Sequence, residues 1–161
     1  MIMKTLSILA VGIVVVVGGW WLLFGGRDPV TQAIREMVVA TVTLETGAGE
    51  LVQLEVKLAG SSEARTRGLK GVDPEVVEEN ILYMEYPFSA TVAHRTEDVQ
   101  TAIDMAFFDS EGQLLAIFSA EPREPVGYRP KEPYQYVLMA RSGRFEEEGI
   151  DEESRLRLVL D

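Results

Sequence analysis

The sequence predicts a small, mainly β domain of antiparallel barrel or sandwich-like type, with one or two short helices and a single transmembrane helix before it. About seven short segments rich in β-branched and aromatic residues recur between turn-forming residues. They lack the long helical crossovers between them that a parallel sheet requires, which favours antiparallel pairing. An uncharged apolar run at residues 6–24 accounts for the transmembrane helix.

Length and composition limit the possible functions. A chain of 161 residues suits one domain plus an attachment segment. Its 15 Lys and Arg against 26 Asp and Glu give a net charge of -11, which repels phosphate backbones, so no nucleic-acid partner is expected. Cysteine is absent from the sequence, which excludes disulfides, thiolate metal sites and thiol nucleophiles.

Residues 6–24 are long enough to cross a bilayer, at about 28 Å as a helix against a hydrocarbon core of about 30 Å. A cleavable signal peptide has a shorter apolar region followed by small residues, and Leu22-Leu23-Phe24-Gly25 does not provide them. The pattern therefore favours an anchor, or an uncleaved signal, at residues 1–24. A linker follows at residues 25–36, where glycines and a proline interrupt the helix, and the β-rich domain occupies residues 37–161.

Within the domain, a short helical turn fits residues 30–37, and the alternating segments 37–45 and 51–59 suggest a hairpin. A helix of two turns or fewer is expected within residues 61–71, after an N-cap at Ser61 or Ser62 and before a glycine. A proline-rich surface loop is predicted at 121–133. The remaining strands are predicted at residues 81–86, 101–108, 113–120, 134–140 and 155–160.

Four segments in order resemble one family. They are Arg65-Thr66-Arg67-Gly68-Leu69 with its R-x-x-G-L pattern, ILYMEY, AIDMAFFDSEGQLLAI and YVLMARSGRFEEEGI. Over roughly residues 52–160 the chain resembles the uncharacterised bacterial and archaeal family called domain of unknown function 192. The resemblance implies a small β-rich fold, often behind a membrane or export segment and outside the cytoplasm, with no established activity.

The chain departs from the family pattern at several positions. Residues 95–99 stand where the family has W-M-K-N-T, Lys70 stands in place of a methionine, and Met139 in place of a glutamate. If the shared surface of the family binds a ligand, this member has changed much of that surface.

The only histidine, His94, is the candidate general base, with Asp98 or Asp104 as its partner. A triad needs a nucleophile on an exposed, strained turn, and no G-x-S-x-G elbow occurs in the sequence. A structural histidine is the favoured interpretation. The acidic run at residues 146–153 does not reproduce a calcium loop, so neither a metal nor another cofactor is expected.

Asp104 lies in a strand whose two faces are both largely apolar, so its carboxylate requires a donor. Arg65 is the donor that we expect, because a guanidinium can give a carboxylate two parallel hydrogen bonds. Residues 109–112 read as the turn of a hairpin, with Gly112 free to adopt a positive φ.

The leading hypothesis is a non-enzymatic, membrane-anchored binding or accessory module on the extracytoplasmic side, with an unidentified protein or small molecule as its ligand. The alternatives are a small hydrolase or lyase using His94 with Asp98 or Asp104, and an acidic spacer whose transmembrane helix makes the functional contacts. Any binding surface is expected around Arg65, Tyr83, His94, Arg95, Thr96, Asp98 and Asp104.

Overall fold

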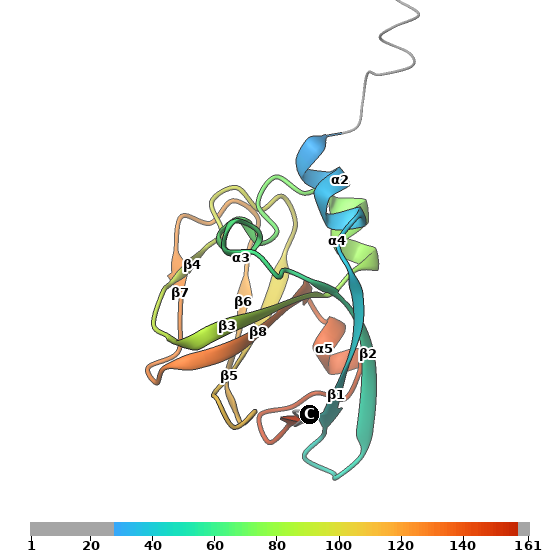
Figure 1. The fold of residues 1–161 in the computed structure, drawn as a ribbon, viewed down its shortest axis with the longest axis vertical. Helices are drawn as coiled ribbons and strands as arrows, with labels where there is room; N and C mark the ends of the chain where they lie inside the picture. The colour runs from blue at the N-terminus through green and yellow to red at the C-terminus, as the bar shows by residue number, and fades with distance from the viewer. Residues whose placement is uncertain (1–27, 158–161) are drawn as a thin grey trace, which may run out of the picture.

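The computed structural model describes residues 28–157, and its largest feature is one curled sheet that is half of a barrel (Figure 1). The strands lie in the order β6-β5-β8-β3-β2-β1-β9, and the pairs are antiparallel, as expected, except one. The strands β2 and β3 are parallel, which corrects the antiparallel expectation, because the connection between them contains two helices and can cross over. Their bounds are β1 Val39–Glu45, β2 Leu51–Leu58, β3 Leu82–Ala90, β5 Ile103–Phe108, β6 Leu114–Ala120, β8 Tyr134–Arg141 and β9 Arg155–Arg157.

Alternating side chains divide the core between the two faces of this sheet. In β5, Ile103, Met105 and Phe107 join one buried cluster, which also contains residues of the helices, while Ala106 and Phe108 join the other. Side chains of a strand alternate between faces, so a strand that is apolar at every position is buried on both sides. The first of these clusters lies beneath the candidate site described below.

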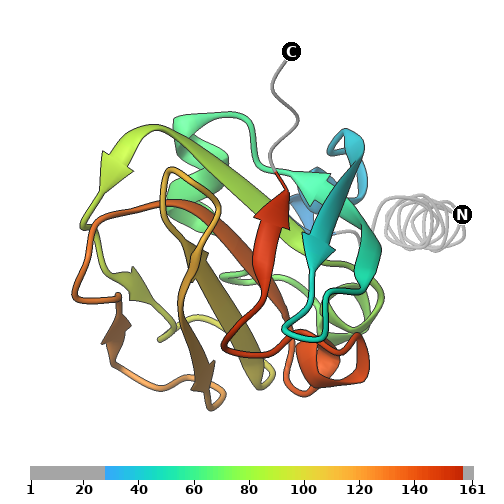
Figure 2. The same cartoon turned by 90° about the horizontal axis from the view of Figure 1, so that it is seen from below.

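The curled sheet nearly closes where its two ends meet. The amide of Leu156 in β9 donates to the carbonyl of Gly112 in the turn between β5 and β6 at 2.7 Å, and Gln113 forms an isolated bridge with Arg155. Figure 2 shows β9, in red, between the β1–β2 hairpin and the golden β5–β6 hairpin. Gly112 has φ +79°, as the sequence allowed for this turn.

The described part of the chain contains four short helices, where one or two were expected. They are α2 (Pro29–Arg35), α3 (Ser62–Arg67), α4 (Pro74–Glu79) and α5 (Arg144–Glu147), and Figure 1 shows α2, α3 and α4 gathered at one end of the molecule. Ile34 of α2 is buried in the core, so the residues expected to end the linker pack against the domain. Proline at the first position starts α2 and α4, where a missing amide proton costs nothing.

The seven predicted strands are confirmed as elements, with ends that differ by a few residues. The sequence did not reveal the two-residue strands β4 (His94–Arg95) and β7 (Gly127–Tyr128), which pair with each other outside the main sheet. Two residues are too few for an alternating pattern. Within residues 28–157 no helix is long and apolar enough to span a membrane, and the predicted span at 6–24 lies outside the described residues.

Candidate functional site

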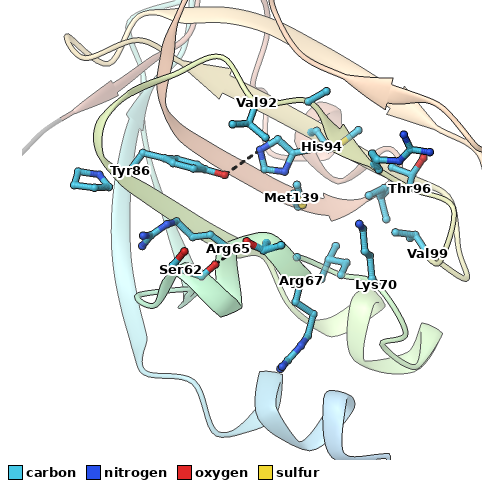
Figure 3. A pocket seen from close by; sticks show the side chains of 18 residues that line it. Ser62, Arg65, Arg67, Lys70, Tyr86, Val92, His94, Thr96, Val99 and Met139 are labelled. Carbon is cyan, nitrogen blue, oxygen red and sulfur yellow. Dashed lines mark hydrogen bonds between the residues drawn. The ribbon is translucent and has the colours of Figure 1, made fainter.

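A pocket of about 470 Å³ lies between the segment that contains α3 and the segment from the end of β3 to β4 (Figure 3). Its floor includes residues of the buried cluster under the helices, namely Leu69, Val99, Ile103, Met105 and Met139. Pockets that bind small molecules commonly have such a size and such an apolar lining, with a few polar groups that orient the ligand.

The rim of this pocket is strongly cationic. Arg65, Arg67, Lys70 and Arg95 line it, and none of its lining residues is Asp or Glu. This is unusual for a chain whose net charge is -11. The pocket therefore has a local charge opposite in sign to that of the whole chain, which favours anions inside it.

Two of the four cations have carboxylate partners. Arg67 pairs with Glu63 at 2.5 Å, and Arg95 pairs with Glu97 at 2.9 Å. Among the residues that the structure describes, no carboxylate lies within salt-bridge distance of the other two, Arg65 and Lys70. These two side chains can pair with an anion from solution without breaking an internal ion pair.

Arg65 is positioned by the local structure of α3. The Ser61 hydroxyl caps this helix by accepting from the Ala64 amide at 3.0 Å, as the sequence predicted. The Arg65 guanidinium donates to the carbonyl of Gly60 at 3.0 Å and lies 5.4 Å above the centre of the Tyr86 ring. A cation over an aromatic face is attracted by its negative charge density, so Tyr86 holds Arg65 at the pocket wall.

Gly68 ends α3 and forms part of the pocket wall. Its φ of +58° and ψ of -131° turn the chain sharply. The following residue, Leu69, is buried in the core beneath the pocket. The R-x-x-G-L motif therefore has a physical explanation: its arginine lines the pocket, its glycine makes the turn and its leucine enters the core.

His94 sits in an aromatic cluster at the side of the pocket. Its Nε2 atom lies 3.1 Å from the Tyr134 hydroxyl and 3.3 Å from the Tyr86 hydroxyl, and its ring is 5.4 Å from that of Phe107. The Tyr134 hydroxyl donates to the carbonyl of Val92 at 2.7 Å. These contacts fix the orientation of the imidazole.

The surroundings favour the neutral imidazole. Burial, together with the nearby Lys70 cation, lowers the pKa of His94 from 6.5 to about 4. Burial also raises the pKa of Tyr134 and of Tyr86, although a hydrogen bond with Tyr134 and the Arg65 charge oppose the rise for Tyr86. At neutral pH, all three side chains are uncharged.

Asp104 is buried and partnered, as predicted, but Arg65 is not its donor. Its carboxylate accepts from the Ser119 hydroxyl at 2.7 Å, from the Ser142 hydroxyl at 3.1 Å and from the Gly143 amide at 2.8 Å. Asp104 points to the face of the sheet opposite the pocket, because its neighbours Ile103 and Met105 face the pocket side. The expectation of an Arg65–Asp104 pair was wrong for this reason.

The structure brings together four of the seven residues expected at a binding surface and separates the other three. Arg65, His94, Arg95 and Thr96 line the pocket. Tyr83 is on the opposite face, stacked 6.3 Å from Tyr136. Asp98 is exposed on the neighbouring loop, outside the pocket lining, and Asp104 lies on the opposite face.

Sequence reasoning missed Lys70, Tyr86, Tyr134 and Met139 as parts of this site. A signal did exist for two of them. Lys70 and Met139 are departures from the family pattern, and both line the pocket, as do the first residues of the altered segment 95–99. Several positions at which this chain differs from the family pattern therefore lie around one cavity.

The site is not suited to hold a transition metal through its own side chains. In the part of the chain from residue 28 to residue 157, no three His, Cys, Asp or Glu side chains are grouped to bind a metal. The cationic rim would also repel a metal cation.

Comparisons with known proteins agree with the fold. A crystal structure from Sinorhizobium meliloti, described as that of a candidate transcription regulator, superposes with a TM-score of 0.68 at 24% identity, covering 75% of this chain and 94% of the other. A protein of unknown function from Novosphingobium aromaticivorans gives a TM-score of 0.68 at 17% identity, covering 83% of this chain and 100% of the other. Both are similar in fold.

No curated protein matches the chain in sequence. A family profile matches residues 42–158, which is most of the chain. It is the profile of domain of unknown function 192 (DUF192), described as Uncharacterized ACR. The matched region includes every strand of the curled sheet except the first residues of β1. The resemblance seen in the four motifs is confirmed, and this chain belongs to the DUF192 family.

Proposed function

We propose that this chain is a membrane-anchored binding module, outside the cytoplasm, that holds a small organic anion in the pocket between α3 and β3 and does not transform it. The charge of the pocket is the observation that carries the proposal. Four cationic side chains and no carboxylate line it, on a chain with a net charge of -11. A cavity lined by one sign of charge concentrates ligands of the opposite sign.

The apolar floor and the volume define the rest of the ligand. A cavity of about 470 Å³ is suited to a small molecule. Its floor of leucine, valine, isoleucine and methionine favours an apolar body beneath the anionic group. A nucleic acid is a poor candidate because the acidic chain around the pocket repels a polyanion.

The arrangement of titratable groups supports binding over catalysis. A dyad of His94 with Asp98 or Asp104 requires contact between imidazole and carboxylate, whereas the Nε2 atom of His94 contacts tyrosines. The carboxylate of Asp104 is occupied by three donors on the other face of the sheet. With a pKa of about 4, His94 is also a weak base at neutral pH.

Anchoring rests on the apolar run at residues 6–24 and on the position of α2. The helix α2 begins at Pro29 and its Ile34 is buried in the domain, so few residues separate the predicted span from the folded part. The extracytoplasmic side is proposed from the family resemblance, since such domains often follow a membrane or export segment.

Binding is tested with two matched probes, 3-phenylpropionate and its uncharged analogue 3-phenylpropionamide. The full-length chain in nanodiscs of zwitterionic lipid is titrated with each probe and followed by NMR of the methyl groups of Met105 and Met139, which line the pocket. We expect the anion to bind about tenfold more tightly than the amide, because a hydrogen bond to a charged group contributes about 1.5 to 3 kcal/mol.

The control compares charge removal inside and outside the pocket. The double variant Arg65→Gln and Lys70→Gln should lose the preference for the anion, whereas Lys131→Gln, at an exposed position that does not line the pocket, should retain it. Equal binding of the two probes to the unaltered chain, or no binding of either, would refute the proposal.

Anchoring is tested by extraction of membranes with alkaline carbonate. The full chain should remain in the pellet, and a variant with Val15→Arg and Val16→Arg in the predicted span should be released, because two charges at the bilayer centre oppose insertion. Protease added to spheroplasts, on which a periplasmic or a cell-surface domain is accessible, should then cleave the domain. Recovery of the unaltered chain in the carbonate supernatant would contradict the anchor.

A further inference from the structure

We infer that the pocket selects organic anions that also carry a hydroxyl or N–H group, because His94 presents an unprotonated ring nitrogen to the ligand. This inference rests on the proposed anion-binding function and names the second polar group that the ligand needs. Small hydroxy acids and N-acyl amino acids are examples of this chemical class.

The contacts of Tyr134 determine which nitrogen of His94 carries the proton. A tyrosine hydroxyl has one proton, and in Tyr134 it is donated to the carbonyl of Val92 at 2.7 Å. The oxygen of Tyr134 can then only accept at its 3.1 Å contact with Nε2 of His94. We assign Nε2 as the donor on this shorter contact, with the Tyr86 hydroxyl at 3.3 Å as the weaker one, so in the neutral ring Nδ1 has a free lone pair.

The second nitrogen faces the pocket. Figure 3 shows the His94 ring with one nitrogen toward Tyr86 and the other turned toward the side where Arg65 and Lys70 lie. Nδ1 takes part in none of the hydrogen bonds within residues 28–157, and it is not among the buried atoms there that lack a partner. It is thus accessible to a ligand.

His94 differs from the other lining side chains in its hydrogen-bonding chemistry. Among the 18 described residues around the pocket, the other polar side chains are cationic donors or hydroxyls that carry their own proton. Apart from the weakly accepting thioethers of Met105 and Met139, His94 alone presents an acceptor without a proton. A ligand group that donates a hydrogen bond finds a matched partner there. A carboxylate oxygen at the same place would set one lone pair against another, which disfavours anions that have no donor.

Burial and the neighbouring cation keep the ring in this state at neutral pH. Protonation of Nδ1 would convert the acceptor into a donor, and it is opposed by the desolvation of the ring and by the charge of Lys70, which lower the pKa of His94 to about 4. Lys70 thus has two roles: it attracts the anion and it keeps His94 neutral beside it.

The experiment compares 3-phenyllactate with 3-phenylpropionate, which differ only by a hydroxyl group beside the carboxylate. Both are titrated against the full-length chain in zwitterionic nanodiscs, with nitrogen-15 NMR of the single imidazole. We expect 3-phenyllactate to bind about three- to tenfold more tightly, the range that a net hydrogen bond gives. The resonance of Nδ1 should be that of an unprotonated nitrogen, and it should shift with 3-phenyllactate only.

The variant His94→Phe separates this contact from the rest of the pocket. Its ring can keep the packing against Phe107 but carries no nitrogen acceptor, so the preference for the hydroxy acid should disappear while 3-phenylpropionate still binds. Unaltered NMR shifts of the distant strand β1 verify that the variant is folded.

The outcomes distinguish this inference from the proposed function. If neither anion binds, the proposed function itself fails. If both bind with equal affinity, or if Nδ1 proves to be the protonated nitrogen of the free protein, the inference about the donor group is overturned and anion binding stands.

Discussion

The guanidinium of Arg65 lies 5.4 Å above the centre of the Tyr86 ring, at the wall of a pocket that no carboxylate lines. This pairing joins α3 to β3, which α4 separates in the chain. It gives the cation a fixed position without neutralising it. The first prediction follows from this geometry.

Arg65→Lys should weaken binding of 3-phenylpropionate although the charge is retained. Lysine lacks the planar fork that meets a carboxylate with two parallel hydrogen bonds, and it stacks less well on Tyr86. We expect a loss of about three- to tenfold, measured by NMR titration, and a comparable loss for Tyr86→Leu. Unchanged affinity in both variants would show that the stacking does not position the cation.

Lys70→Met, which restores the residue of the family pattern, should raise the pKa of His94. Lys70 is the second cause of the lowered pKa after burial, so its removal leaves only the desolvation of the ring. The imidazole NMR titration should move from about 4 toward 6.5 without reaching it. The control is Lys131→Gln, which should leave the titration unchanged.

Acidification should destabilise the domain through His94. The folded pKa of about 4 is below the value of 6.5 for an exposed imidazole, so between these pH values the unfolded chain binds the proton more readily. The contribution of neutral His94 is therefore fully present above pH 6.5 and decreases as the pH falls toward 4. Urea denaturation over this range should show a shallower pH dependence for His94→Gln than for the unaltered chain. Parallel curves for the two proteins would be inconsistent with a buried, neutral imidazole.

Asp104→Asn should destabilise the domain by about 1 to 3 kcal/mol, the cost of a buried group without its partner. An asparagine can still accept from Ser119 and Ser142, but its amide group would face the amide of Gly143 as donor against donor. The measurement is the free energy of unfolding by urea. Asp98→Asn is the matched control, because Asp98 is exposed and the change should be nearly neutral. Equal stabilities of the two variants would contradict the role assigned to Asp104.

Gly112→Ala should destabilise the domain much more than Gly49→Ala. Both glycines have a φ near +80°, at +79° and +81°, and so both substitutions incur the same backbone strain, of about 1 kcal/mol or more. A methyl group on Gly112 would lie 2.1 Å from the carbonyl oxygen of Leu156, whereas one on Gly49 would meet nothing within 4 Å. The difference in unfolding free energy between the variants measures the closure of the sheet by β9, and a difference near zero would show that this closure is unimportant.

The larger elements could be predicted from the sequence because their signals are local. The alternation of Ile103, Met105 and Phe107 with their neighbours follows from the two-residue period of a strand, and it indicated the buried strand β5 and its turn at Gly112. The capping serine and terminal glycine of α3 are likewise visible within a few residues. The motif R-x-x-G-L identified the family by the same kind of local information.

The composition of the site was decided by tertiary structure. Nothing local shows that Tyr134, 40 positions beyond His94, determines which nitrogen of that ring carries the proton. Nor could the sequence show that Arg65 and Asp104 lie on opposite sides of the sheet. Which face of a strand lies toward the helices depends on the elements that pack against it. Contacts between residues distant in sequence arise only when the sheet has curled and the helices have packed on one face. By itself, the sequence determined the class of fold and the family, and it predicts an anchor at residues 6–24. The tertiary structure decided which side chains share the pocket and what charge it has.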